Sequence, residues 1–216
     1  MKKLLILNQL IILTLSLYGC SYFDNESKLS KILEYYKNQD TEKELITISK
    51  EIVDSIQYPI IEIRTNGILR QSLMIQVSNR YDFKNFLSGS GQAITMQGGA
   101  ITKTNGMNTH LISLNLDKKS NLLSKTTPKN WKKNSQKSYT FITSQATPLE
   151  LTFLCEINIR GVETINIASS DYNLTKIFES CKNESYEFEN IYWVDSDGFI
   201  MRSLQWISIE DIYAEI

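Results

Sequence analysis

From Ile60 onward, the chain repeats short runs of β-branched and aromatic residues separated by Gly, Asn and Ser. Runs of this kind at short intervals are typical of strands joined by tight turns. No helical pattern separates the runs, so they are not arranged as the βαβ units that build a parallel sheet. The sequence therefore predicts a mainly β fold, with an antiparallel sheet that forms a curved sandwich or an incomplete barrel.

Gly and Asn pairs mark the expected turns. We expect Asn66-Gly67, Gly98-Gly99 and Asn105-Gly106 to lie between neighbouring strands. Further strands are expected in SYTFITS, LELTFLCEINI, VETINIAS, NLTKIFES, ENIYWVDS and FIMRSLQWIS. Residues 117–137 are rich in Lys, Asn and Ser, and this composition predicts a looser segment.

One helix is predicted before the strands, in TEKELITISKEIVDSIQYP. Its apolar residues repeat at the spacing of one helix face. Thr41 and Glu44 have the spacing of a capping box, and Pro59 ends the pattern. We expect this helix to pack on an open face of the sheet.

The first twenty residues have the layout of a secretory signal, with Lys2 and Lys3 before an apolar run that ends at Cys20. Leu17, Gly19 and Cys20 resemble the lipobox of bacterial lipoproteins, where lipid is attached to the Cys. The alternative is a plain signal peptide with a coincidental Cys. The expected organisation is a signal peptide at 1–19, a lipidated Cys and tether at 20–40, and a single mainly-β domain at 41–216.

A lipidated Cys20 would tie the domain to a membrane, because two or more acyl chains give stable anchoring. Ser21 follows the Cys. By resemblance to lipoprotein sorting in enterobacteria, a residue other than Asp at this place favours the outer membrane. We expect an outer-membrane lipoprotein whose domain faces the periplasm.

Two cysteines remain if Cys20 carries lipid. A disulfide between Cys155 and Cys181 would enclose a loop of roughly 25 residues and contribute about 3 kcal/mol in the chain-entropy model. The alternative is two buried free thiols, because sequence spacing does not show how closely the Cα atoms approach.

Motifs for catalysis, metal or cofactor binding are missing from the sequence. His110 is the single His and has no His or Cys cluster nearby, so we predict neither a metal site nor a His-based catalyst. There is no G-x-S-x-G, phosphate-binding loop or H-E-x-x-H. The net charge of −1 gives no indication of a nucleic-acid partner.

Asp195 and Asp197 stand two residues apart in the stretch YWVDSDGFIMRS. On one strand face they would form a carboxylate pair suited to acid–base chemistry. Alternatively, D-S-D-G is what a tight turn requires, because Asp bonds backbone N–H groups and Gly198 accepts a positive φ. We favour the turn, and we expect Arg202 on the returning strand to pair with Asp195.

A cluster of lysines surrounds Trp131, namely Lys125, Lys129, Lys132, Lys133 and Lys137. Trp131, Lys132 and Lys133 are candidates for contact with an anionic polymer or with a partner protein. The alternative is a solvated loop whose Trp closes the edge of the core.

Several motifs together resemble the group 4 capsule polysaccharide lipoproteins, also called YjbF-type lipoproteins. YWVDSDGFIMRSLQ resembles the C-terminal signature of that family through Trp193, Val194, Asp195, Gly198, Ile200, Arg202, Ser203 and Gln205. GGAITKTNGMNTHLISL resembles a second family segment through Gly99, Ile101, Lys103, Thr104, Gly106 and Met107. The lipobox and the segment QYPIIEIR fit the same pattern.

The resemblance implies an envelope lipoprotein that supports secretion or assembly of capsule or exopolysaccharide, with no established catalytic residues. The expected partners are outer-membrane or periplasmic export proteins, or the polysaccharide itself. One alternative is a polysaccharide hydrolase that uses Asp195, Asp197 or Glu189, and would need a cleft around those acids. Another is a lipid or lipopolysaccharide carrier, which would need an apolar cavity inside the sheet.

Overall fold

The computed structural model describes residues 48–66, 71–107, 111–117, 120–124 and 126–216. The predicted signal peptide, Cys20, the tether, the capping box of Thr41 and Glu44, and His110 lie outside these ranges. Three short helical segments lie within them, α3 (Lys50–Ser55), α4 (Asn121–Ser124) and η2 (Pro128–Asn130). The strands are β1 (Ile60–Thr65), β2 (Ser72–Arg80), β3 (Phe83–Ser88), β4 (Ala93–Gln97), β5 (Ala100–Asn105), β6 (Leu111–Leu116), β7 (Asn134–Ile142), β8 (Pro148–Ile167), β9 (Ser170–Lys182), β10 (Glu187–Val194), β11 (Ile200–Ser208) and β12 (Ile212–Glu215).

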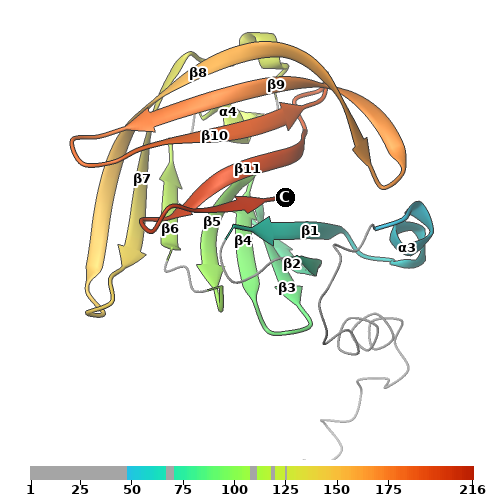
Figure 1. The fold of residues 1–216 in the computed structure, drawn as a ribbon, viewed down its shortest axis with the longest axis horizontal. Coiled ribbons are helices and arrows are strands. Elements are labelled where there is room, and N and C mark those ends of the chain that lie inside the picture. Colours follow the sequence, from blue (N-terminus) through green and yellow to red (C-terminus); the bar gives the residue numbers. More distant parts are fainter. Residues whose placement is uncertain (1–47, 67–70, 108–110, 118–119, 125) are drawn as a thin grey trace, which may run out of the picture. The chain divides into compact units, whose positions relative to one another are not determined.

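The strands form one antiparallel sheet in the order β5-β4-β3-β2-β1-β12-β11-β10-β9-β8-β7-β6. Figure 1 shows that this sheet curves strongly, and it forms a nearly closed barrel. Most neighbours follow each other in sequence, as expected for strands joined by short turns. The predicted mainly-β antiparallel fold is confirmed.

The exception to sequential order is the pairing of β1 with β12, which places Arg64 opposite Glu215 and Thr65 opposite Ala214. Asn66 secures this junction. Its Oδ1 accepts a hydrogen bond from the backbone N–H of Tyr213, at 2.7 Å and 147 residues away. Through this pairing, the half of the sheet from β1 to β5 joins the half from β6 to β12.

The inner face of the sheet is filled with aromatic rings. Phe188 and Trp206 stack with ring centres 4.2 Å apart, and Tyr139 meets Trp206 edge-on at 5.4 Å. Phe153 meets both rings of this stack edge-on, at 4.9 Å from Phe188 and 5.6 Å from Trp206. Aromatic pairs in these geometries add stability beyond the area that they bury.

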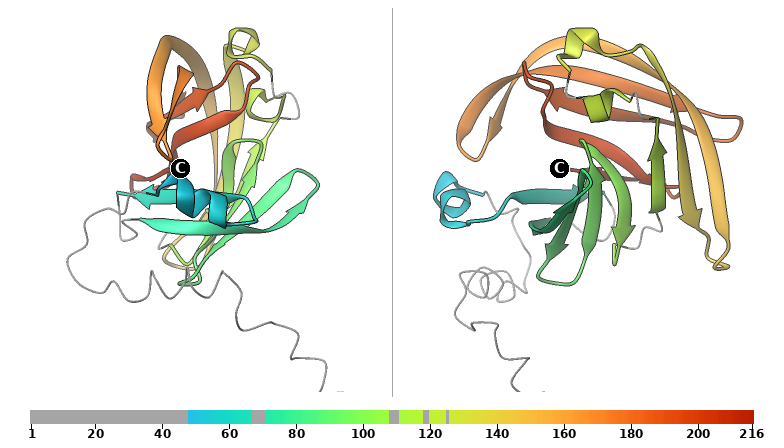
Figure 2. Two further views of the ribbon diagram at one scale, coloured as in Figure 1. Left: turned by 90° about the vertical axis from the view of Figure 1, so that its right-hand side faces the viewer. Right: turned by 180° about the vertical axis from the view of Figure 1, so that it is seen from behind.

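A second, smaller apolar cluster lies on the other face of the sheet. It consists of the buried residues Ile165, Leu174 and Trp193, with partly buried residues around them. The hairpin of β8 and β9 extends far enough to supply two of these side chains, and Figure 2 shows its strong curvature. A β-bulge at Gly161, where φ is +117°, interrupts the register of β8 before this extension.

The helix before the sheet differs from the prediction. Within the described residues it spans only Lys50–Ser55, and none of its residues is buried. The helix therefore covers no face of the sheet within the described residues, and the interior is filled by strand residues together with Leu122 and Trp131. No helix among the described residues is long and apolar enough to cross a bilayer.

The other differences concern strand limits. Two predicted runs form the single strand β8, and β7 begins at Asn134 inside the segment expected to be loose. Strands β3 and β12 were not predicted. Both are short and carry polar residues, which weakens the strand pattern in the sequence.

Candidate functional site

Asp195 shapes the turn between β10 and β11. Its Oδ1 accepts hydrogen bonds from the backbone N–H groups of Asp197 at 2.9 Å and Phe199 at 2.8 Å. Gly198 has a φ of +87°, a conformation that glycine adopts without steric cost. The stretch D-S-D-G therefore acts as a turn, and the Asp195 carboxylate is occupied by the turn itself.

Arg202 does not pair with Asp195, so that prediction was wrong. Arg202 lies opposite Trp193 in the register, and a bulge between Trp193 and Val194 shifts the strand before the turn. Its guanidinium donates to the carboxylate of Glu215 on β12, with Nε at 2.7 Å from Oε1. The same guanidinium lies 4.9 Å from the centre of the Trp193 ring.

These contacts belong to a row of side chains across neighbouring strands, which we call the Trp193 ladder: Glu163, Lys176, Trp193, Arg202 and Glu215. The Trp193 Nε1 donates to Glu163 Oε2 at 2.9 Å, and Lys176 Nζ lies 3.0 Å from the same oxygen. Lys176 also lies 5.2 Å from the centre of the Trp193 ring.

The Trp193 ladder affects the ionisation of Glu163. The hydrogen bond from Trp193, and then the one from Lys176, lower the pKa of the Glu163 carboxyl. Trp193 itself is 7% exposed, so its ring is held within the ladder and is not presented to a sugar. The ladder is a structural tie between strands.

The two motifs that carry the family resemblance meet in space. Gln205 on β11 donates from Nε2 to the Gly99 carbonyl at 2.8 Å, and its Oε1 accepts from the Ile101 N–H at 3.0 Å. A Cβ atom on Gly99 would lie 2.1 Å from Ile200 Cδ1, so any larger residue there would force the Ile200 side chain to move. These motif residues thus hold β5 against β11, a relationship that their separation in the sequence conceals.

Trp131 is buried, with 8% of its surface exposed. Its Nε1 donates to the Thr126 carbonyl at 3.0 Å, and its ring meets Tyr192 edge-on at 6.2 Å. This placement fits the alternative in which the Trp closes the edge of the core. Lys132 and Lys133 are exposed beside it, whereas Lys125 lies outside the described residues.

Two surface depressions lie next to this segment. One has a volume of about 370 Å³ and is lined by Trp131, Lys133, Glu156, Ile157, Asn158 and Ile159. The other, of about 550 Å³, is lined by Asn134, Ser135, Leu154, Cys155, Glu156, Ser180, Lys182 and Glu187. Both include Glu156, which pairs with Lys133 at 3.0 Å, and we call the combined area the Glu156 surface. Neither depression is lined by Asp195, Asp197 or Glu189.

Lys137 does not belong to the surface cluster in which the sequence placed it. It is 2% exposed and its Nζ lies 2.5 Å from Glu179 Oε2, which is equally buried. The same oxygen accepts hydrogen bonds from Asn190 Nδ2 at 2.9 Å and Tyr192 Oη at 3.0 Å. Lys137, Tyr139 and Phe141 stand two residues apart on one strand, so they share its inward face. This spacing is the sequence signal for the inward position of Lys137.

Burial and the nearby Glu179 carboxylate raise the pKa values of Tyr139 and Tyr192 well above the usual range. Both phenols therefore keep their protons well above the pH at which an ordinary tyrosine ionises. Tyr192 uses its proton to donate to Glu179, so the buried network consists of one ion pair supported by neutral donors.

Cys155 and Cys181 lie directly opposite each other on β8 and β9 and form a disulfide. Glu179 lies close to both sulfur atoms, in a grouping that could suit a metal ion. Because the two sulfurs are bonded to each other, they are not thiolate ligands. The grouping gives no support to a metal site.

The chain is similar in sequence to a known protein family and in fold to a solved structure. The model of the family described as group 4 capsule polysaccharide lipoprotein gfcB, YjbF matches residues 27–216. The crystal structure of the hypothetical lipoprotein YmcC from Escherichia coli (K12) is similar with a TM-score of 0.67 and 18% sequence identity. The similarity covers 88% of this chain and 94% of that one, and it shows a shared fold. No curated protein matches the sequence.

Proposed function

Because the chain belongs to the group 4 capsule polysaccharide lipoprotein family, we propose that it supports the secretion or assembly of capsule or exopolysaccharide as a non-enzymatic binding factor. The observation that carries this proposal is the family match over residues 27–216. The family is one of membrane-anchored envelope lipoproteins. We propose further that lipid is attached at Cys20, that the protein lies in the outer membrane and that its domain faces the periplasm.

The Glu156 surface is the part of the domain that we propose for contact with an export protein or with the polymer. It presents both signs of charge, from Lys133 and Lys182 and from Glu156 and Glu187. The apolar side chain of Leu154 lies among them and is 67% exposed. Apolar surface rimmed by charged groups is typical of sites that recognise another molecule.

The arrangement of the described residues supports binding over the two alternatives. A hydrolase using Asp195, Asp197 or Glu189 would need a cleft around those acids, but neither depression described above is lined by them, and the Asp195 carboxylate accepts hydrogen bonds within its own turn. A lipid carrier would need an apolar cavity, whereas the inner face packs ring against ring at 4.2 to 5.7 Å around Phe188.

The test is complementation of a strain from which the gene has been deleted, with capsule or exopolysaccharide output and its retention at the cell surface as readouts. We expect Lys133→Glu with Lys182→Glu to lower both readouts, because the exchange reverses both positive groups of the Glu156 surface. The matched control is Lys50→Glu with Lys103→Glu, since both of these lysines are also exposed. Unchanged output after deletion would refute the export role, and equal effects of the two double variants would refute the Glu156 surface.

The location is tested separately. Replacing Cys20 by Ala should abolish incorporation of labelled palmitate and release the protein from outer-membrane fractions. Retention of the Cys20→Ala protein in those fractions would contradict anchoring at this residue.

A further inference from the structure

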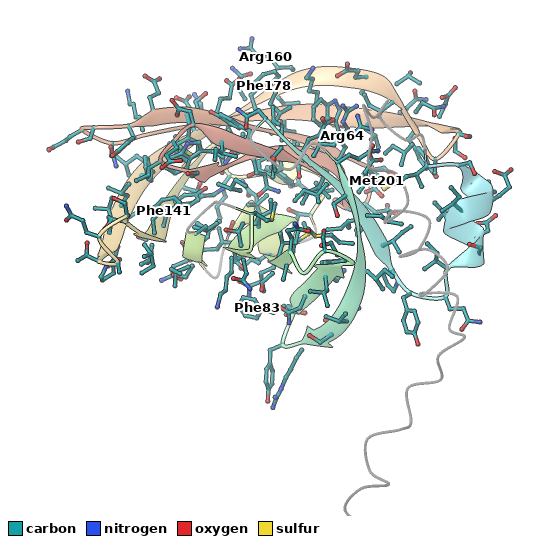
Figure 3. The ribbon with its side chains drawn as sticks, turned by 60° about the horizontal axis from the view of Figure 1, so that its bottom comes forward. Arg64, Phe83, Phe141, Arg160, Phe178 and Met201 are labelled. Carbon is teal, nitrogen blue, oxygen red and sulfur yellow. A yellow bond between two sulfur atoms is a disulfide. The ribbon has the colours of Figure 1, made fainter. Side chains whose placement is uncertain are left out.

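The β2–β3 hairpin projects from the barrel. The last four residues of β2 are exposed at every position, although a strand covered on one face would alternate. Figure 2 shows the hairpin extending away from the body, and Figure 3 places Phe83 on it, on the other side from Arg160 and Phe178. The outer part of this hairpin therefore has neither face covered by the domain.

Several exposed residues of the hairpin are large and apolar. Tyr81 is 79% exposed, Val77 60% and Phe83 38%. Tyr58 is 64% exposed and lies near Val77 at the base of this part, because the neighbouring Pro59 carbonyl accepts a hydrogen bond from Gln76 N–H at 2.8 Å. A group of large apolar side chains on a projecting element marks a contact surface.

Cationic side chains accompany the rings. Arg80 lies 5.1 Å from the centre of the Tyr81 ring, and Lys84 follows on β3, against the single acid Asp82 between them. Tyr81 and Asp82 have φ values of +52° and +66°, as a tight hairpin turn requires. The combination of aromatic rings and cations at one tip matches the interface of a bilayer, where rings sit at the headgroup level and cations meet anionic lipids.

The arm is held in a defined shape. Asn85 Nδ2 donates to Ser78 Oγ across the hairpin at 2.7 Å, and Thr95 Oγ1 on β4 donates to Asn85 Oδ1 at 2.7 Å. These bonds tie the projecting part to the next hairpin. A stiff arm presents its tip without losing further conformational entropy on contact.

We propose that the tip of the β2–β3 hairpin, formed by Arg80, Tyr81, Asp82, Phe83 and Lys84, inserts into the surface of an anionic bilayer. The family is membrane-anchored, so the domain is already close to a bilayer. Even a fully extended chain between Cys20 and Ile48 reaches about 100 Å at most. Confinement of this kind makes a weak second contact effective, because that contact becomes intramolecular.

The shape of the tip favours lipid over a protein partner. The two depressions described above include no residue of the hairpin, and the tip is a projection with the exposed rings of Tyr81 and Phe83 at its end. A projection of this kind enters a fluid surface without needing a matching groove. The proposal depends on the membrane anchor and not on the export role.

The experiment uses the full lipidated chain in vesicles of phosphatidylethanolamine and phosphatidylglycerol, with and without brominated acyl chains near the headgroups. The Tyr81→Trp variant places an indole at the tip. Trp131, Trp193 and Trp206 are buried and give a constant background. The matched control is Val162→Trp on β8, an exposed apolar position two residues after Arg160, which Figure 3 shows on the other side of the domain from Phe83.

We expect brominated lipid to reduce the additional emission of Tyr81→Trp, with a shift of its maximum to shorter wavelength, and to leave the emission of Val162→Trp unchanged. Adding Arg80→Glu and Lys84→Glu to Tyr81→Trp should restore most of the emission that brominated lipid quenches. Equal quenching of the two single variants, or no quenching of Tyr81→Trp in vesicles that carry the protein, would overturn the proposal. Flotation of the protein with the vesicles reports on the anchor alone, so failure of the anchor and failure of the hairpin are distinguished.

Discussion

Replacing Lys137 by Met tests the buried ion pair most directly. Both partners are 2% exposed, and Glu179 Oε2 keeps only Asn190 and Tyr192 as donors once the ammonium is gone. Met has a similar length, so little of the effect comes from a cavity. Removing one partner of a buried pair leaves an uncompensated charge, and we expect a loss of about 3 to 5 kcal/mol in the free energy of unfolding.

The assay is urea unfolding at neutral pH with the disulfide intact, followed by tryptophan fluorescence and circular dichroism. Glu179→Gln and the double variant complete a cycle, and we expect the double variant to cost less than the sum of the single ones by about 1 to 3 kcal/mol. The control is Lys133→Met. Its ion pair with Glu156 has side chains 74% and 60% exposed, so its loss should be below about 1 kcal/mol.

Two results would refute this reasoning. If Lys137→Met lowered the free energy of unfolding no more than Lys133→Met does, breaking the buried ion pair would cost no more than breaking the exposed one. Strict additivity in the cycle would show that Lys137 and Glu179 act independently, despite the 2.5 Å between Nζ and Oε2.

Three further predictions concern the sheet. In double-mutant cycles on the free energy of unfolding, Arg202→Ala and Glu215→Ala should be coupled by up to about 1 kcal/mol, whereas Arg202→Ala and Asp195→Ala should be additive. Coupling between Arg202 and Asp195 would contradict the geometry. Because the pKa of Glu163 is lowered, its carboxylate stabilises the fold at pH values above the ordinary carboxyl pKa, and this stability is lost as pH falls. The urea midpoints of the native protein and Glu163→Gln should therefore converge in acid. A difference between the midpoints that grows in acid would refute this role of Glu163. Replacing Cys155 and Cys181 by Ala should remove roughly 3 to 4 kcal/mol of stability for a loop of 26 residues, measured by thermal and urea unfolding, and an unchanged midpoint would exclude a stabilising disulfide.

The sequence was sufficient for the fold class because strand patterns repeat locally. The turn at Asp195 and Gly198 was also predictable, since its hydrogen bonds join residues two to four apart. Partners across the sheet were not predictable in the same way. Arg202 pairs with Glu215 because β12 lies beside β11 and a bulge shifts the register at Trp193, and neither fact is visible in a local pattern.

The misplacement of Lys137 has a related cause. Its neighbours in sequence are polar, so composition suggested a loop in solvent. Period-two alternation with Tyr139 and Phe141 indicated an inward position, but only a buried acid from another strand makes a lysine acceptable there. The contact of Gly99 with Ile200 was hidden for the same reason, because the sequence alone does not show which strands face each other across the barrel.

The junction of β1 and β12 has a consequence for the timing of folding. The Asn66 side chain binds backbone groups of Asp211 and Tyr213, so the closing contacts join segments up to 147 residues apart. Contacts this distant form late, because the long intervening chain must first be brought together at an entropic cost. While the chain folds, β1 must wait with one edge unpaired until β12 arrives. The domain is therefore most exposed to proteases and to aggregation during that interval, before its final strand is in place.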